Sequence, residues 1–255
     1  MKLSVLGCHG GETPKHRTSA FLIDDRLAID AGALTSSLEV PSQCAIEAVL
    51  ISHAHLDHIR DLSTIADNRV QNGAPPLKVF ATQDTIDVLV THFFNGQIWP
   101  DFTKIPTGRG PTIELVPLIV GKPNNVAGYI VTPVPVNHTV DCSGFVVDDG
   151  VSSIAYSGDT GPTDLVWRVL SGQSNLKAAL VEVSFPNSAQ SLATVSGHHT
   201  PATLAVDIKK YSKPIDLPTL LYHMKPSFQA EIERECARLA GVNVTPLRLG
   251  DEFSL

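Results

Sequence analysis

The sequence of 255 residues lacks the features that mark several common classes of protein. Its four cysteines, Cys8, Cys44, Cys142 and Cys236, form no CxxC pair, so we expect small buried hydrophobic residues in a reducing compartment. No apolar run approaches the length of a membrane span, and too little sequence precedes Val5-Leu6-Gly7-Cys8 for a lipoprotein signal. We therefore expect a cytoplasmic protein that neither spans nor binds a membrane.

Basic residues are few as well. The chain has 19 Lys and Arg against 26 Asp and Glu, and its formal net charge is −7. Binding a long nucleic acid requires a basic stripe, so we expect no such partner. A small anionic substrate stays possible, because bound metal cations reverse the local field. No linker, charge run, low-complexity tract or short repeat divides the sequence, which favours one domain over residues 1–255.

Metal-binding side chains are concentrated in the segment Ile51-Ser52-His53-Ala54-His55-Leu56-Asp57-His58. It follows the apolar run 48–51, which predicts a short buried strand. His53 and His55 are two residues apart, so an extended backbone points both imidazoles the same way. Asp57 and His58 follow where we expect a helix to begin, near Ile59. The pattern predicts two sets of ligands, one with His53 and His55 and one with Asp57 and His58. The alternative is a histidine-rich surface turn.

Three further candidates lie just beyond predicted strands: His138, Asp159 and His223. His138 could complete a three-histidine set with His53 and His55. Asp159 could bridge two ions with its two carboxylate oxygens, and His223 could join Asp57 and His58. Each of these residues alone would more often be structural, but together they predict two filled coordination sets. Imidazole nitrogen and carboxylate oxygen suit zinc, or manganese or iron at lower affinity.

Strands and helices alternate along the chain, with several consecutive strands in each half. This arrangement favours an α/β fold of two packed sheets with helices outside, a four-layer αββα sandwich, over a doubly wound parallel sheet. The apolar patterns predict strands over residues 3–6, 20–23, 27–29, 48–51, 79–81, 113–118, 129–136, 144–147, 152–156, 180–183 and 219–222, and helices over 59–66, 83–94, 200–210 and 229–239.

Four other features have structural interpretations that we prefer to functional ones. Asp30 follows a predicted hairpin and is expected to hydrogen-bond a loop near the metals. Trp99 could stack a substrate ring, but a hydrophobic anchor is the simpler interpretation. His92 is expected on a helix surface or in the core. The loop Gly7-Cys8-His9-Gly10-Gly11 lacks both the Walker spacing and the full GxGxxG pattern, so it is expected to be a turn beside the site.

The sequence resembles the metallo-β-lactamase superfamily and, within it, the class II cyclic-nucleotide phosphodiesterases. The motifs that carry the resemblance span nearly the whole chain: His55-Leu56-Asp57-His58-Ile59, Phe94-Asn95, Ile98-Trp99-Pro100, Tyr156-Ser157-Gly158-Asp159-Thr160-Gly161, Val181-Glu182-Val183-Ser184-Phe185, Gly197-His198-His199-Thr200-Pro201 and His223-Met224-Lys225-Pro226. One departure is His199, which stands where the family has an apolar residue, so that either His198 or His199 could face the substrate. A likeness to elements of tRNase Z implies that Glu182 orients His198.

The resemblance implies a metal-dependent hydrolase that converts 3′,5′-cyclic nucleotides, most of all cyclic AMP, to 5′-monophosphates. Two divalent ions, Zn²⁺ first and Mn²⁺ or Fe as alternatives, would generate a bridging hydroxide that attacks phosphorus. Asp57 would ligate metal and orient this nucleophile. His198 would donate a proton to the leaving alkoxide or a hydrogen bond to the phosphate. The partner is thus a small anionic nucleotide, and a homodimer is an open alternative for the assembly.

Two other functions are considered. One is a nuclease of the tRNase Z type or another small-phosphodiester hydrolase, against which stand the acidic balance and the absence of a basic, glycine-rich arm. The other is a protein without hydrolytic activity, either a redox di-iron protein or a metal-stabilised binding module. A redox protein is expected to replace a histidine of the first cluster with a carboxylate and to carry a flavin domain, and the sequence has neither.

Overall fold

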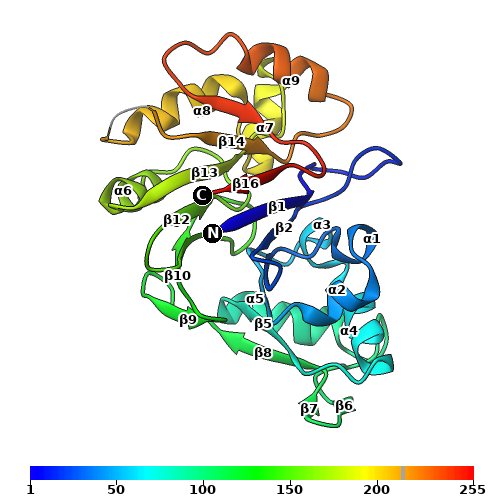
Figure 1. Cartoon of the computed structure of the whole chain (residues 1–255). Coiled ribbons are helices and arrows are strands. Elements are labelled where there is room, and N and C mark those ends of the chain that lie inside the picture. The colour runs from blue at the N-terminus through cyan, green and yellow to red at the C-terminus, as the bar shows by residue number, and fades with distance from the viewer. Residues whose placement is uncertain (214–215) are drawn as a thin grey trace.

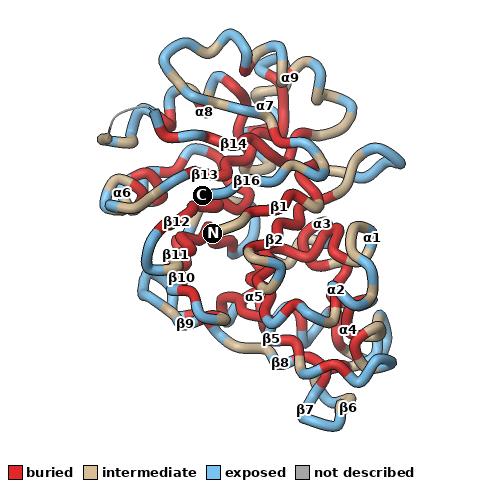
Figure 2. The backbone as a smooth tube through the Cα atoms, viewed as in Figure 1, coloured by how far each residue is buried: buried red, intermediate tan, exposed pale blue. Residues whose placement is uncertain are grey.

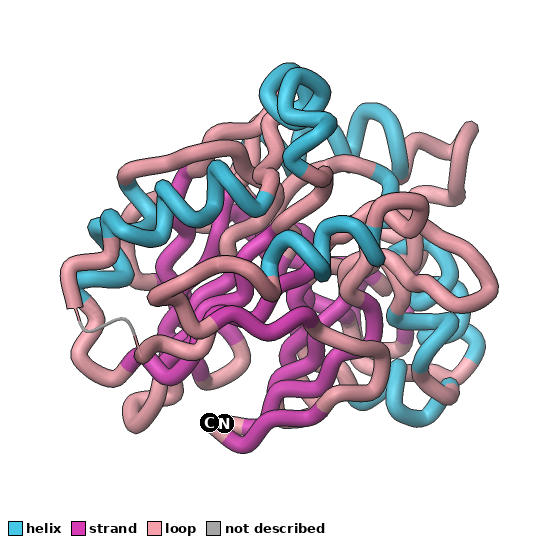
Figure 3. The backbone as a smooth tube through the Cα atoms, turned by 90° about the horizontal axis from the view of Figure 1, so that it is seen from above, coloured by secondary structure: helices cyan, strands magenta, loops and turns pink. Residues whose placement is uncertain are grey.

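Two seven-stranded sheets pack face to face, with helices outside both, in the computed structural model, which describes residues 1–213 and 216–255. Figure 1 shows helices α1 to α4 on one side of the strands and α8 and α9 on the other. Seen from above, the strands run through the middle of the molecule (Figure 3). The predicted four-layer α/β sandwich is therefore confirmed.

The first sheet is formed by strands from the first half of the chain, and the last strand of the chain lies at one of its edges. Its strands are, in spatial order, β16 (Glu252–Ser254), β1 (Lys2–Gly7), β2 (Ala20–Ile23), β3 (Leu27–Ile29), β4 (Ala48–Leu50), β5 (Leu77–Ala81) and β8 (Ile113–Pro117). The pairs from β16 to β3 are antiparallel, and those from β3 to β8 are parallel. A short hairpin lies outside this sheet and consists of two strands of two residues each, β6 (Pro106–Thr107) and β7 (Gly110–Pro111).

The second sheet repeats the same pattern with the second half of the chain. Its strands are, in spatial order, β9 (Asn124–Val126), β10 (Tyr129–Pro135), β11 (Ser143–Asp148), β12 (Ser153–Tyr156), β13 (Leu176–Glu182), β14 (Thr219–Tyr222) and β15 (Val244–Pro246). The pairs from β9 to β12 are antiparallel, and those from β12 to β15 are parallel. Each sheet thus has three antiparallel strand pairs at one end and three parallel pairs at the other.

The helices divide between the two halves in the same way. Those of the first half are α1 (Leu34–Ser37), α2 (Val40–Ala45), α3 (Leu56–Ile59), α4 (Leu62–Gln71) and α5 (Gln83–Val88), which continues as the π-helical turn η1 (Leu89–Phe93). Those of the second half are α6 (Leu165–Gly172), α7 (Gln190–Ser196), α8 (Pro201–Asp207) and α9 (Gln229–Cys236), with the 3₁₀ turns η2 (Asn187–Ala189) and η3 (Ile208–Lys210). Within the described ranges, no helix combines the length and apolar character that a bilayer crossing requires.

Apolar side chains fill three layers, one between the sheets and one under the helices on each outer face. In the central layer the ring of Phe21 lies 5.6 Å from that of Tyr156 and 5.4 Å from that of Tyr222. Because both faces of each sheet are covered, strands such as β2 and β3 are apolar throughout and fully buried. Figure 2 shows this burial along the strands, while the β6–β7 hairpin stays largely exposed.

Local sequence explains several boundaries. Asp24 and Asp25 both have positive φ, as the central residues of the tight turn between β2 and β3, which the Arg26 N–H closes by donating to the Ile23 carbonyl oxygen at 3.0 Å. Thr82 caps α5 by accepting the backbone N–H of Thr85. Several predicted boundaries differ from the structure. The single helix expected over 59–66 is two helices, α3 from Leu56 and α4 from Leu62, and the strand expected over 180–183 begins at Leu176.

Candidate metal centre

The predicted site residues lie at one edge of the sandwich, where strands of both sheets end. His53 follows β4, His138 follows β10 and Asp159 follows β12. Glu182 is the last residue of β13, and His223 directly follows β14. Strands that point the same way present their carboxyl ends at one edge, which brings residues far apart in sequence into one cluster.

Three histidines converge on one point. The Nδ1 atom of His55 lies 3.0 Å from Nε2 of His53 and 3.2 Å from Nε2 of His138. His53 is fully buried, whereas His55 and His138 are half-buried. The nitrogens converge from three directions, as the predicted set of His53, His55 and His138 requires.

A second set lies beside the first. The Nε2 atoms of His58 and His223 are 3.3 Å apart. An Asp57 carboxylate oxygen lies 3.3 Å from Nε2 of His223 and 3.9 Å from Nε2 of His58. The first turn of α3 therefore supplies Asp57 and His58, while the end of β14 supplies His223.

Asp159 lies between the two sets. Its Oδ2 atom is 3.2 Å from Nε2 of both His58 and His223 and 3.8 Å from Nε2 of His53. Its other oxygen is buried and, within residues 1–213 and 216–255, has no hydrogen-bond partner. A buried, unpartnered carboxylate oxygen is costly unless another group satisfies it.

The outer nitrogen of His58 is held by the Asp30 carboxylate, which accepts its Nδ1–H at 2.7 Å. Asp30 is fully buried and also accepts hydrogen bonds from the Ser52 backbone N–H (2.8 Å), the Ser52 hydroxyl (2.9 Å) and the Tyr156 hydroxyl (2.6 Å). Ser52 in turn accepts the Nδ1–H of His53 at 3.0 Å. Asp30 therefore has the structural role predicted for it, and it leaves Nε2 of His58 free to bind an ion.

His138 and His223 are oriented in the same way by the second half of the chain. The Nδ1–H of His138 donates to the Gly197 carbonyl oxygen at 3.1 Å, so Nε2 carries the lone pair. The Nδ1–H of His223 donates to the Ser184 hydroxyl oxygen at 2.9 Å. Gly197 has φ +68°, and a Cβ atom there would lie 3.1 Å from Cα of His138, so glycine is required for this approach.

The spacing of these atoms fits metal ions. Two nitrogens bound to one tetrahedral Zn²⁺ at about 2.0–2.1 Å lie roughly 3.3 Å apart. The nitrogen separations of 3.0 to 3.3 Å in the two sets agree with this value. The unpartnered Asp159 oxygen and the lone pairs directed inward are the donors that such ions require. The site is therefore suited to divalent metal.

The electrostatics of the site favour cations. Burial lowers the pKa of His53 well below its usual range, which keeps its imidazole neutral. Burial opposes ionisation of Asp159 too, but the charges of His223 and His58 hold its pKa well below the usual range. The pKa of His58 is raised despite burial, because Asp159 and Asp30 surround it. These carboxylates make the centre attractive to a proton or, in its place, a metal ion.

His198 lies beside the centre in the loop between α7 and α8. Its Nδ1–H donates to Oε1 of the fully buried Glu182 at 2.7 Å, and its ring centroid lies 5.1 Å from that of His138. Burial lowers the pKa of His198, but the Glu182 carboxylate outweighs this effect and raises it above its usual value. The imidazole is therefore oriented by Glu182 and protonated more readily than a free histidine.

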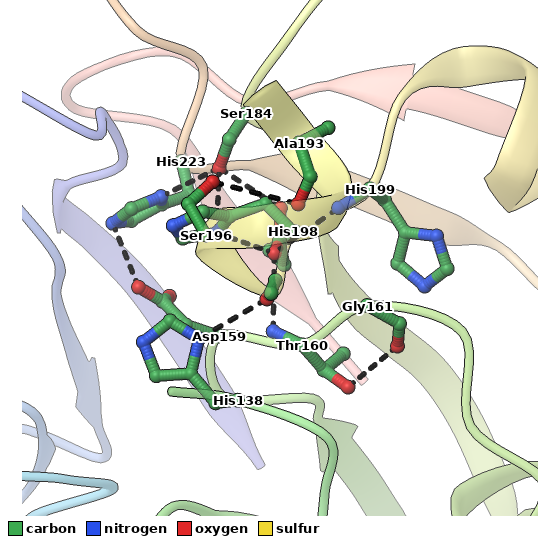
Figure 4. A network of polar contacts seen from close by, with 12 residues as sticks. His138, Asp159, Thr160, Gly161, Ser184, Ala193, Ser196, His198, His199 and His223 are labelled. Carbon is green, nitrogen blue, oxygen red and sulfur yellow. Dashed lines mark hydrogen bonds and ion pairs between the residues drawn. The ribbon is translucent and has the colours of Figure 1, made fainter. Parts of the chain in front are cut away.

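The adjacent His199 faces the other way. Figure 4 shows its ring directed away from His138, Asp159 and His223. Its Nδ1 atom lies 3.1 Å from the Thr203 hydroxyl. The sequence left open which of the two histidines faces the substrate; the structure turns His198 toward the centre.

Several supporting residues escaped the sequence analysis. The Ser184 hydroxyl donates to Oε2 of Glu182 at 2.9 Å while it contacts Nδ1 of both His198 and His223. Ser184 stood inside a motif, but its contacts depend on residues distant in sequence. Gly10 was interpreted only as part of a turn; a Cβ atom there would lie 2.4 Å from the His223 carbonyl oxygen. Nothing in a single sequence indicates that the backbones of Gly10 and His223 lie so close together.

Two aromatic candidates lie outside the centre. Trp99 packs against the outer apolar layer of the first sheet, and its Nε1–H donates to the Ser63 carbonyl oxygen at 3.1 Å. The interpretation of Trp99 as a hydrophobic anchor is therefore confirmed. His92 is exposed on η1, in agreement with its prediction.

Comparisons with known proteins agree with this fold. The family described as "Beta-lactamase superfamily domain" matches residues 28–224. A protein of Yersinia pestis named "Probable 3′,5′-cyclic-nucleotide phosphodiesterase" is 30% identical over 276 aligned residues, which cover 88% of this chain and 78% of that protein. One of Aliivibrio fischeri named "3′,5′-cyclic-nucleotide phosphodiesterase" is 30% identical over 180 residues, covering 64% of this chain and 52% of that protein.

Among solved structures, unliganded yeast PDE1 is similar with a TM-score of 0.83 at 20% identity, covering 100% of this chain and 99% of that chain. At this identity the likeness supports the fold alone. Fold and donor set together define a metal-dependent hydrolase of the metallo-β-lactamase superfamily. Within this superfamily, the chain belongs to the 3′,5′-cyclic-nucleotide phosphodiesterase family.

Proposed function

We propose that this protein hydrolyses 3′,5′-cyclic nucleotides, cyclic AMP foremost, to 5′-monophosphates. The observation that carries the proposal is His198, held by Glu182 at 2.7 Å immediately beside the two donor sets. A metal-binding protein without hydrolytic activity would have no need for an imidazole that a buried carboxylate orients and makes easier to protonate at this position. The Yersinia pestis and Aliivibrio fischeri relatives support the same substrate class.

The proposed cofactors are two divalent ions, Zn²⁺ first, with Mn²⁺ or Fe as alternatives. His53, His55 and His138 would hold one ion, Asp57, His58 and His223 the other, and Asp159 both. When bound, the ions would supply the nucleophile by lowering the pKa of a shared water to give a hydroxide near neutral pH, and would neutralise charge on the phosphate.

The chain's own groups then complete the reaction. Asp57, half-buried at the rim of its set, would orient the nucleophile as well as ligate. Attack on phosphorus breaks the bond to the ribose 3′-oxygen, and His198 would give its proton to that oxygen as it leaves. The Glu182 carboxylate would stabilise the imidazolium before this transfer and keep its Nδ1 protonated afterwards.

A panel of phosphodiesters tests the proposal. We expect the metal-replete protein to hydrolyse cyclic AMP with a higher kcat/KM than 2′,3′-cyclic nucleotides, bis(p-nitrophenyl) phosphate or a tRNA precursor. The product of cyclic AMP should be the 5′-monophosphate. Cleavage of the tRNA precursor with no turnover of 3′,5′-cyclic nucleotides would instead identify a tRNase Z-type enzyme.

A further inference from the structure

A cavity of about 280 Å³ opens directly beside the candidate centre. We name it the base pocket; its lining residues are Ala54, His55, Asp84, Thr85, Val88, Val140 and Asp141. His55 directs Nδ1 at the donor sets and also lines the pocket. Val140 and Asp141, which also line the pocket, lie between β10 and β11 in the loop that carries His138. One donor, His55, is therefore shared between the pocket and the centre.

The size and walls of the pocket suit a flat ring. Pockets that bury a whole drug-sized ligand have volumes of about 300–1,000 Å³, so this smaller cavity suits one part of a nucleotide. Val88 and Val140 line it and are 41% and 42% exposed, leaving apolar surface that a base would cover. Only the ribose separates a base from the cyclic phosphate, so the base must lie in a cavity next to the centre.

A second cavity beside the centre, of about 310 Å³, is less suitable. It is lined by Glu12, Asp57 and Arg60, with Leu56 as its large apolar side chain. Arg60 forms an ion pair with Glu12 across it. A base there would face charged groups that are already paired.

The polar groups of the base pocket accept hydrogen bonds. Asp141 is held in place because one of its oxygens accepts hydrogen bonds from the Thr82 and Thr85 hydroxyls. Asp84 and Asp141 are both exposed and line the pocket, so their carboxylate oxygens are accessible to a ligand. Two carboxylates repel a phosphate but accept N–H donors, so they suit a base edge and not the anionic part of the substrate.

We propose that this cavity binds the nucleobase and that Asp84 and Asp141 select bases with an exocyclic amino group. The inference rests on the proposed function and adds the part of the substrate that determines specificity. Adenine and guanine each present an amino group to the carboxylates. Where adenine and cytosine carry the amino group, hypoxanthine and uracil carry a carbonyl oxygen, which a carboxylate disfavours, so that only a ring N–H remains as a donor.

Removing a single amino group from the substrate tests this directly. We expect kcat/KM to be about 10-fold or more higher for cyclic AMP than for the 3′,5′-cyclic monophosphate of purine riboside, because a hydrogen bond to a charged group is lost. Asp84→Asn combined with Asp141→Asn should reduce this ratio to about 3-fold or less. Asp87→Asn, on the same helix and outside the pocket, is the matched control and should keep the ratio.

Filling the pocket provides a second test that does not depend on the carboxylates. Val88→Trp should lower kcat/KM about 10-fold more for cyclic AMP than for methyl p-nitrophenyl phosphate, which has no base. Val90→Trp, exposed on η1 and outside the pocket, is the control and should change neither value. The base pocket alone would be overturned by two results together. One is an equal kcat/KM for cyclic AMP and for the 3′,5′-cyclic monophosphate of purine riboside. The other is a kcat/KM for cyclic AMP that is the same in Val88→Trp as in Val90→Trp. Turnover of the small diester without turnover of either cyclic nucleotide would overturn the proposed function and this inference with it.

Discussion

Replacing His198 by alanine separates proton donation from metal binding. His198 lies outside the two proposed ligand sets, although it is near enough to His138, Asp159 and His223 to be a further candidate ligand. Because its Nδ1–H is held by Glu182, we expect His198→Ala to keep the metal content of the protein unchanged. The imidazole is fixed by Glu182 at 2.7 Å, and this carboxylate outweighs burial and raises the pKa of His198 above its usual value, which favours the charged form. A general acid contributes about 100- to 10,000-fold, or about 2.7–5.4 kcal/mol of transition-state stabilisation. We therefore expect His198→Ala to decrease kcat for cyclic AMP by a factor of about 100 to 10,000.

The assay compares two leaving groups on the same variant. Cyclic AMP expels a ribose alkoxide, which requires a proton, whereas a p-nitrophenyl ester expels a phenolate that does not. The loss caused by His198→Ala should therefore be at least 10-fold smaller for the p-nitrophenyl ester. His199→Leu is the matched control, because His199 points away from the centre and the family has an apolar residue there. An equal loss for both esters would mean that His198 binds phosphate, and a larger loss in His199→Leu would refute the assignment.

Three further predictions concern the metals and the residues that orient the site. Metal-replete protein should contain close to two transition-metal ions per chain by elemental analysis, and a chelator should abolish turnover and lower the Tm by about 5–10 °C; a content below one ion with full activity would contradict this. Asp30→Asn keeps the shape of the side chain but removes the charge that holds His58, so metal affinity measured by competition with a chelating dye should fall about 10- to 100-fold. Glu182→Gln removes the carboxylate that raises the pKa of His198, so His198 should lose its proton at lower pH. In this variant the alkaline decline of kcat for cyclic AMP should move to lower pH, while metal content stays the same; an unmoved pH profile would exclude His198 as the acid.

The strands that form the interior could be predicted because their composition reflects burial on both faces. The bounds expected for β2, β3 and β14 agree with the structure. The edge strands β9, β15 and β16 were not predicted, since each is three residues long and partly exposed. Their strand geometry depends on pairing with a neighbour that the local sequence does not specify. Helices α1, α2, α6 and α7 were also missed, although α6 has an apolar face containing Val166, Trp167 and Leu170.

The candidate donors could be found because each follows an apolar strand, and strands of one direction end at one edge. Their functional roles stay predictions. The groups that orient them could not be found in this way. Tyr156 reaches Asp30 across 126 positions in the sequence, and Ser184 reaches His223 across 39. The direction of His198 depends on the left-handed backbone of Gly197 at the end of α7, which a single sequence does not reveal.

The donors are divided between two halves of the molecule that repeat one strand pattern. Each set takes two side chains from the first half and one from the second, and Asp159 also comes from the second. A bound ion would therefore cross-link the two sheets, in addition to the Tyr156–Asp30 hydrogen bond that already joins them. During refolding, high metal affinity would arise only after the halves have docked, so the return of activity would report that docking step. Once captured, the ion would slow separation of the halves, and the lifetime of the folded protein would depend on the supply of metal.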